Sequence, residues 1–189
     1  FTFLSYNTVE GLRPKFGMRT SNEFSTRLML EGYVAYGTRD ERFKYMLGGT
    51  YFLSKKPRTS VGMYFSEDYE LVGQVPNYFS RDHFIQFLTV RNPQDRLILN
   101  KEARIFTKRE WFTGFSTLLE FRRRELSSAG AWNFERVEDI GGELQVRDVN
   151  NIVSSEISLG VRFAYRENFV EGEFTRVSLG STWPILNVR

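Results

Sequence analysis

The sequence predicts an all-β protein, and three observations lead to this fold class. Apolar and polar residues alternate strictly through most of the chain, as in EISLGVRFAYREN at residues 156–168, which is the period of a β-strand. Short polar turns separate the alternating stretches. Apolar residues at helical spacing are scarce. We therefore expect an antiparallel sheet of hairpin-connected strands.

Composition limits the class of protein further. The 189 residues suffice for one domain or one closed barrel, and 41% of them are hydrophobic and 16% aromatic, so wholesale disorder is not expected. No apolar run approaches the ~18 residues that a membrane-spanning helix needs. Acidic and basic residues are interleaved at a net charge of +3, which favours a solvated surface over nucleic-acid binding. With no cysteine, disulfides and thiolate sites are excluded.

The first half of the chain contains four alternating segments. Residues 12–18 include Pro14, which lacks a backbone donor and therefore indicates a sheet edge or a strand end. Segments at 27–36, 43–53 and 61–65 follow. Polar turns at 21–23, 39–41 and 55–57 connect them, which predicts a hairpin meander.

The second half is less regular. Residues 96–106 and 111–122 predict a hairpin that turns about residues 108–110, and residues 157–166 form another strand. A long loop is expected at about 67–95, in which residues 82–90 form either a short helix or part of a strand, and an irregular region is expected at about 124–151. Lys101 shares the parity of its apolar neighbours, which predicts a bulge or an extension beyond the apolar band.

Two folds combine alternation with one apolar face. A soluble barrel or sandwich turns that face inward, whereas an outer-membrane barrel turns it toward lipid and encloses a polar lumen. Several alternating stretches run about 10–13 residues, close to the length that crosses a bilayer at a tilt. Aromatic residues gather near strand ends, as in interfacial girdles. Glycines share the charged face at mid-strand, namely Gly48, Gly114, Gly160 and Gly180. Short turns alternate with longer connections. These features favour an antiparallel up-and-down transmembrane β-barrel.

The energetics of lipid contact predict which side chains line the lumen. An arginine or lysine that faces lipid at mid-membrane costs about 2–4 kcal/mol. Charged side chains at the polar positions of the alternation should therefore face inward and pair with one another. The lumen-facing candidates are Arg27, Glu31, Glu120, Arg122, Arg162, Arg166 and Arg176.

Three stretches resemble a known family: YNTVEGLR at 6–13, LEGYVAYGTRDERFKY at 30–45, and SEISLGVRFAYRENFVEGEFTRVSLGSTWPIL at 155–186. They are similar to the C-terminal barrel, of unknown function, of a large family of Bacteroidetes outer-membrane proteins, many of which carry an N-terminal carboxypeptidase-regulatory-like β-sandwich. The resemblance implies that residues 1–189 are a single partial barrel domain, without that sandwich and without the first and last strands. It supplies no catalytic motif.

The motifs for chemistry are weak. Ser80 and His83 lie together in the expected loop, but a hydrolase would need a third, orienting group and a positioned nucleophile. The acidic residues at 67–70 lack calcium-loop spacing, and no phosphate-binding loop is present. We expect no catalytic residue, cofactor or metal. Arg122–Arg124 could contact lipid or lipopolysaccharide phosphates, although a solvated strand end is the simpler interpretation.

The sequence therefore predicts a non-enzymatic outer-membrane β-barrel protein with a transport, assembly or surface-anchoring role. Its expected partners are the lipid bilayer and lipopolysaccharide, with no nucleic acid. The alternative is a soluble β-barrel or β-sandwich module that binds a small ligand in its apolar interior.

Overall fold

The structure is a computed structural model that describes residues 3–71, 97–129, 134–140 and 143–189. These residues form thirteen strands and no helix, so the all-β class is confirmed. None of the described residues belongs to a helix long and apolar enough to cross a membrane.

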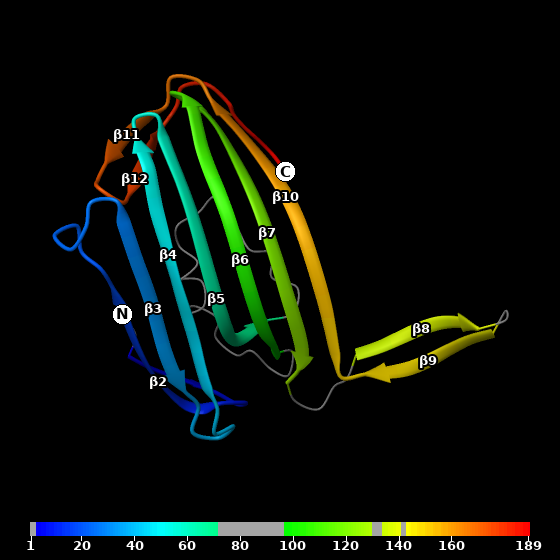
Figure 1. Cartoon of the computed structure of the whole chain (residues 1–189). Coiled ribbons are helices and arrows are strands. Elements are labelled where there is room, and N and C mark those ends of the chain that lie inside the picture. The colour runs from blue at the N-terminus through cyan, green and yellow to red at the C-terminus, as the bar shows by residue number, and fades with distance from the viewer. Residues whose placement is uncertain (1–2, 72–96, 130–133, 141–142) are drawn as a thin grey trace.

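Most of the strands join one antiparallel sheet, in the order β1-β2-β3-β4-β5-β6-β7-β10-β13. Strands β8 and β9 form a hairpin that projects away from the sheet, and β11 and β12 form a second hairpin at the opposite end (Figure 1). The bounds are β1 (Leu4–Asn7), β2 (Gly11–Arg19), β3 (Leu28–Tyr36), β4 (Phe43–Lys55), β5 (Arg58–Leu71), β6 (Leu97–Phe112), β7 (Phe115–Ser128), β8 (Phe134–Ile140), β9 (Glu143–Val149), β10 (Asn151–Ala164), β11 (Asn168–Glu171), β12 (Arg176–Gly180) and β13 (Ile185–Val188).

The large sheet is open among the described residues. Strands β1 and β13 lie at its two edges and do not pair with each other, so no closed barrel is formed. Strand β10 pairs with β7 from Asn151 to Phe163 but with β13 only from Val161 to Ala164. One edge of β10 from Asn151 to Gly160 is therefore unpaired within the described part of the chain.

Strong curvature makes one face of the sheet concave. Arg13 of β2 and Asp68 of β5 form an ion pair at 2.7 Å, although β3 and β4 separate their strands. Three strand spacings amount to about 14 Å in a flat sheet. The two side chains can therefore meet only because the sheet bends toward the face that carries them. Figure 1 shows the resulting trough.

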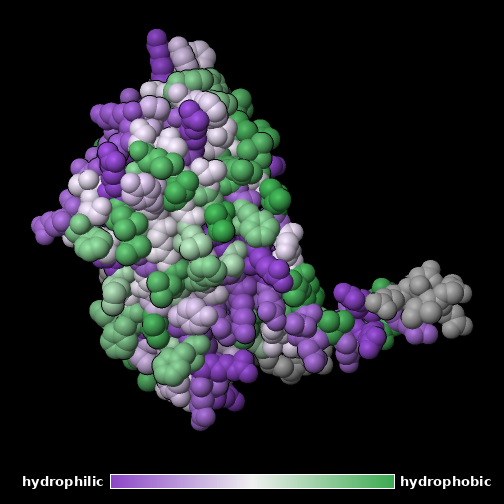
Figure 2. Space-filling model, in the orientation of Figure 1, coloured by the Kyte–Doolittle hydropathy of each residue, from purple (hydrophilic) through white to green (hydrophobic). Residues whose placement is uncertain are grey.

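The two faces of the sheet differ in chemistry as the alternation predicts. Leu47 and Ile157 on the convex face are 66% and 75% exposed, whereas Lys44 on the concave face is completely buried. Figure 2 shows apolar patches over the body of the sheet and mainly hydrophilic residues on the projecting β8–β9 hairpin. The exposed apolar side chains of the convex face are Leu12, Phe16, Met18, Leu30, Val34, Phe43, Tyr45, Leu47, Tyr51, Leu53, Val61, Met63, Phe65, Ile105, Leu119, Phe121, Ile157, Leu159 and Phe163.

Glycines on the concave face make room for aromatic rings. Gly48 lies opposite Tyr64 in the β4–β5 register, and a Cβ at Gly48 would stand 2.1 Å from the Tyr64 ring. Gly62 is covered in the same way by Phe106. The expectation that Gly114 and Gly180 lie at mid-strand is wrong. Gly114 is in the β6–β7 turn and Gly180 ends β12, both with positive φ.

Three sequence-based boundaries differ from the structure. The β6–β7 hairpin turns at residues 113–114 rather than 108–110, because β6 continues through a bulge between Glu110 and Phe112. The region 124–151, expected to be irregular, contains the end of β7 and the β8–β9 hairpin. Residues 67–71, assigned to the long loop, extend β5, and residues 72–96 lie outside the described residues. The register is regular at Lys101, so the bulge predicted there is absent.

Aromatic contacts concentrate at the two ends of the strands. Tyr36 and Phe43 pack at a ring distance of 4.9 Å beside the β3–β4 turn. At the opposite end Phe112 stacks on Phe115 at 5.2 Å beside the β6–β7 turn. Tyr165 packs on Trp183 just beyond β10. Aromatic pairs thus lie at both ends of the strands, while Tyr64 and Phe106 stack at mid-strand.

The Gly48–Tyr64 contact predicts an overpacking effect. Gly48→Val should lower the free energy of unfolding by about 1–3 kcal/mol because the new side chain overlaps the ring. The control Leu47→Val, on the exposed face, should change it by less than about 0.5 kcal/mol. Urea unfolding of the intact chain measures both. In a chain that also carries Tyr64→Ala the Gly48→Val penalty should largely disappear. An equal penalty in both backgrounds would contradict the assigned contact.

Candidate functional site

Charged side chains gather in three clusters on the concave side of the sheet. The first lies where the β1–β2 and β3–β4 turns meet β5. The second lies on β7 and β10 near the end of the chain. The third lies beneath the β11–β12 hairpin. Most of their charges are paired, as burial requires.

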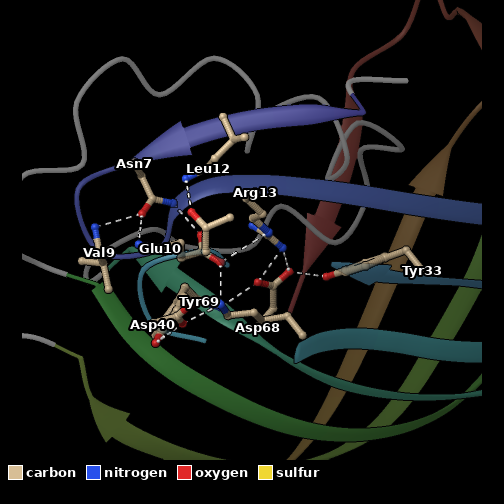
Figure 3. Close-up of polar contacts among 11 residues, drawn as sticks. Asn7, Val9, Glu10, Leu12, Arg13, Tyr33, Asp40, Asp68 and Tyr69 are labelled. Carbon is tan, nitrogen blue, oxygen red and sulfur yellow. Dashed lines mark hydrogen bonds and ion pairs between the residues drawn. The ribbon is translucent and has the colours of Figure 1, made fainter. Parts of the chain in front are cut away.

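The first cluster is built around Asp68 (Figure 3). Both carboxylate oxygens of Asp68 accept hydrogen bonds from Arg13 Nη2, at 2.8 and 2.7 Å, and Tyr33 also donates its hydroxyl to Asp68. Arg13 Nε lies 3.4 Å from Glu10 Oε1. Because Arg13 and Glu10 are almost fully buried, this cluster ties β2, β3 and β5 together on the concave side.

The same cluster extends to the β3–β4 turn. Lys44 Nζ lies 3.0 Å from Glu10 Oε1 and 2.5 Å from Asp40 Oδ2. Tyr69 donates its hydroxyl to Asp40 at 2.9 Å. Asn7 accepts the backbone N–H of Glu10 at 2.7 Å, which shapes the β1–β2 turn and directs Glu10 inward. The two turns therefore supply charged side chains that connect strands distant from one another in the sheet.

The second cluster joins β7 to the C-terminal residue. Arg122 Nη2 donates to Glu120 Oε1 at 2.6 Å, with both side chains 3% exposed. Arg189 reaches the same Glu120 oxygen at 3.2 Å and donates to the Ser158 hydroxyl at 3.0 Å. Since Glu120 and Arg122 are two apart on one strand, they occupy the same face. Their pairing keeps two charges on the concave side.

The third cluster holds the β11–β12 hairpin against the sheet. Arg162 binds Glu167 with two parallel hydrogen bonds of 2.6 and 2.5 Å, and Ser178 of β12 also donates to Glu167. Arg176 of β12 donates to Glu110 of β6 at 2.7 Å. These residues line a pocket of about 470 Å³ between the hairpin and the sheet.

The Glu167 carboxyl, which follows β10 outside the strand, has a lowered pKa. Burial by itself raises it, but the hydrogen bonds from Arg162 and Ser178 and the charges of Arg162 and Arg176 together outweigh burial. Glu167 is therefore ionised when the hairpin is in place. The hairpin contact depends on that charge.

The seven residues predicted to face the lumen occupy different kinds of position in the structure. Glu120, Arg122, Arg162 and Arg176 belong to the second and third clusters. Glu31 faces the same side and accepts the Tyr64 hydroxyl at 2.7 Å. Arg27 and Arg166 lie outside the strands, where alternation does not place them on either face. Both are exposed, because Arg27 precedes β3 and Arg166 follows β10 with φ +51°.

Sequence reasoning missed the first cluster entirely. Glu10, Asp40 and Asp68 lie in turns or at a strand end, where alternation gives no assignment. The parity of Arg13 and Lys44 had placed them on the non-apolar face, which is where they lie. Their burial could have been inferred from that parity, whereas their partners come from elements distant in sequence.

The sequence offered two kinds of chemical site to look for, a metal site and a Ser–His pair. Within the described ranges no group of three or more His, Asp or Glu residues could hold a metal ion. Ser80 and His83 lie outside the described residues, so the idea of a catalytic pair there stays untested.

Comparison with family models, with curated proteins and with solved structures finds no match to this chain.

The first cluster predicts a large effect of removing one partner. Asp68→Ala should lower the free energy of unfolding by about 3–5 kcal/mol, because Arg13 is left buried without its main carboxylate. Lys55→Ala removes the exposed Lys55–Glu173 pair and should cost less than about 1 kcal/mol. Urea unfolding of both variants provides the comparison. If both variants lose the same free energy of unfolding, burial does not make the Arg13–Asp68 pair more important for stability than an exposed pair.

The lowered pKa of Glu167 predicts acid sensitivity of the hairpin. A carboxyl whose folded-state pKa is depressed stabilises the fold fully above its unfolded pKa of about 4.3 and loses this contribution as pH falls through the folded value. The free energy of unfolding, measured at a series of pH values from neutral downward, reveals this loss. Glu167→Gln should remove this part of the acid dependence, and the exposed Glu173→Gln should retain it. An unchanged pH profile in Glu167→Gln would refute the assignment.

Proposed function

We propose that the chain forms part of an outer-membrane β-barrel, with its convex face toward lipid and its concave face lining a polar interior. The observation that carries the proposal is the sidedness of the sheet. The convex face exposes apolar side chains along the successive strands β2 to β10, whereas the concave face buries paired charges. A soluble protein rarely leaves so extended an apolar surface open.

The dimensions of the apolar face support this proposal. On β4 the exposed apolar residues run from Phe43 to Leu53, ten residue steps that span about 33 Å at the usual rise per residue. A strand tilt of about 40° reduces this to about 25 Å, the height of the apolar band of an outer-membrane barrel. The aromatic pairs at the two ends of the strands would then lie near the two interfaces.

The unpaired sheet edge adds a second argument. Strand β10 leaves its backbone unpaired from Asn151 to Gly160 on one side. Unpaired backbone in the hydrocarbon region costs several kcal/mol per group. We therefore propose that further strands pair with this edge and with the β1–β2 edge, which would close the barrel.

The polar concave side favours a transport role over assembly or surface anchoring. Ionic clusters and a pocket lined in part by charged residues lie on the concave side, where a polar solute could pass or bind. The resemblance to the Bacteroidetes outer-membrane family supports the same location, and we extend the proposal to membership of that family. No enzymatic activity is proposed.

An arginine scan along β4 tests the proposal. Leu47→Arg, near the middle of the apolar run, should destabilise the protein folded in lipid vesicles by about 2–4 kcal/mol, and Leu53→Arg, near the strand end, by about 0–1 kcal/mol. Both residues are exposed on the same face. Unfolding in vesicles gives the two values. In a soluble fold both substitutions would be tolerated equally in plain buffer, and that result would refute the membrane assignment.

A further inference from the structure

The pocket beneath the β11–β12 hairpin carries more positive than negative charge. Its lining includes the cations of Arg58, Lys108, Arg162 and Arg176. Among the described residues, two carboxylates, those of Glu110 and Glu167, stand against these four positive charges, which leaves a difference of 4 − 2 = +2. This excess is local, because charges of both signs are otherwise interleaved along the chain.

Both carboxylates in the pocket already have close partners. Glu110 accepts Arg176 Nη1 at 2.7 Å, and the two oxygens of Glu167 accept both terminal nitrogens of Arg162. Neither carboxylate lies within ion-pair distance of Lys108. Within the described part of the chain, no hydrogen bond or ion pair joins the side-chain nitrogen of Lys108 to another residue.

The position of Lys108 is fixed by the sheet. Lys108 lies opposite Ser60 of β5 and Leu118 of β7, so its side chain belongs to the concave face. It is accessible within the pocket. A lysine held among arginines, in a recess reached by solvent, is the arrangement by which proteins attract anionic groups.

Four phenylalanines also line the pocket. Phe52 and Phe174 stack with their ring centres 5.8 Å apart, and Phe115 and Phe169 complete the apolar wall. A volume of about 470 Å³ lies within the range of small-molecule sites. Arg58 lies 4.8 Å from the centre of the Phe52 ring, and Arg176 lies 3.6 Å from that of Phe169. Cations and rings therefore adjoin in the lining, which fits a molecule that carries an anionic group beside an apolar part.

We propose that this pocket binds a small organic anion, with its phosphate group at Lys108 and its apolar part against the phenylalanines. The same phosphate chemistry occurs in soluble phosphate monoesters and in lipid headgroups. The proposal goes beyond the barrel assignment, since it rests on the pocket alone. Loss of anion binding would leave the sidedness of the sheet unaffected.

Calorimetric titration of the intact chain with phenyl phosphate tests the proposal, with phenol as the uncharged probe. Lys108→Gln should weaken phenyl phosphate binding at least about tenfold, because it removes a charged hydrogen-bond donor. Lys108→Arg should retain binding, which separates loss of charge from loss of fold. Lys101→Gln, on the same strand outside the pocket, is the matched control and should bind like the unmodified chain.

Native mass spectrometry with phosphatidic acid distinguishes the two sources of phosphate. Lys108-dependent binding of phenyl phosphate supports a soluble ligand. Lys108-dependent retention of phosphatidic acid, without phenyl phosphate binding, supports a lipid headgroup. The proposal is overturned if neither probe binds, if Lys108→Gln and the unmodified chain bind alike, or if phenol binds as well as phenyl phosphate.

Discussion

The Arg13–Asp68 ion pair joins β2 to β5 across two intervening strands, and the rest of the structure depends on the curvature that this contact requires. A flat sheet would hold these side chains apart and leave both in the open. Once the sheet bends, its charged face becomes the inside of a trough where side chains from distant strands can pair. The opposite face becomes convex, and its apolar side chains diverge from one another.

The curvature also explains why arginines and glycines share the concave face. Side chains converge there, so large residues must alternate with small ones. Gly48 accepts the ring of Tyr64, and Gly62 accepts that of Phe106. The space thus gained allows Tyr64 to reach Glu31, two strands away. The curvature of the sheet thus accounts for both the aromatic packing and the ion pairing on this face.

Much of the sheet could be predicted from the sequence because a strand has an exact two-residue period. Parity alone put Glu120 and Arg122 on the face opposite Leu119, and the structure agrees. Parity failed where the chain leaves a strand. Arg166 continues the alternation of β10 in sequence, but positive φ turns it away.

The clusters themselves could not be predicted, because their partners lie far apart along the chain. Asp68 lies 55 residues after Arg13, and nothing local to either residue specifies the register that brings them together. The β8–β9 hairpin was missed for a different reason. Half of its strand residues are charged, and most of those with a described side chain are exposed. The apolar alternation that reveals a half-buried strand is therefore weak there.

The sidedness of the sheet can be measured most directly with fluorophores on adjacent residues. The chain contains no cysteine, so single cysteines at Leu47, Met46, Leu119 and Leu118 can each be labelled without interference. In vesicles with spin-labelled acyl chains, the labels at Leu47 and Leu119 should be strongly quenched and those at Met46 and Leu118 should not. Equal quenching of neighbours, or quenching of Met46 and Leu118 instead, would contradict the account.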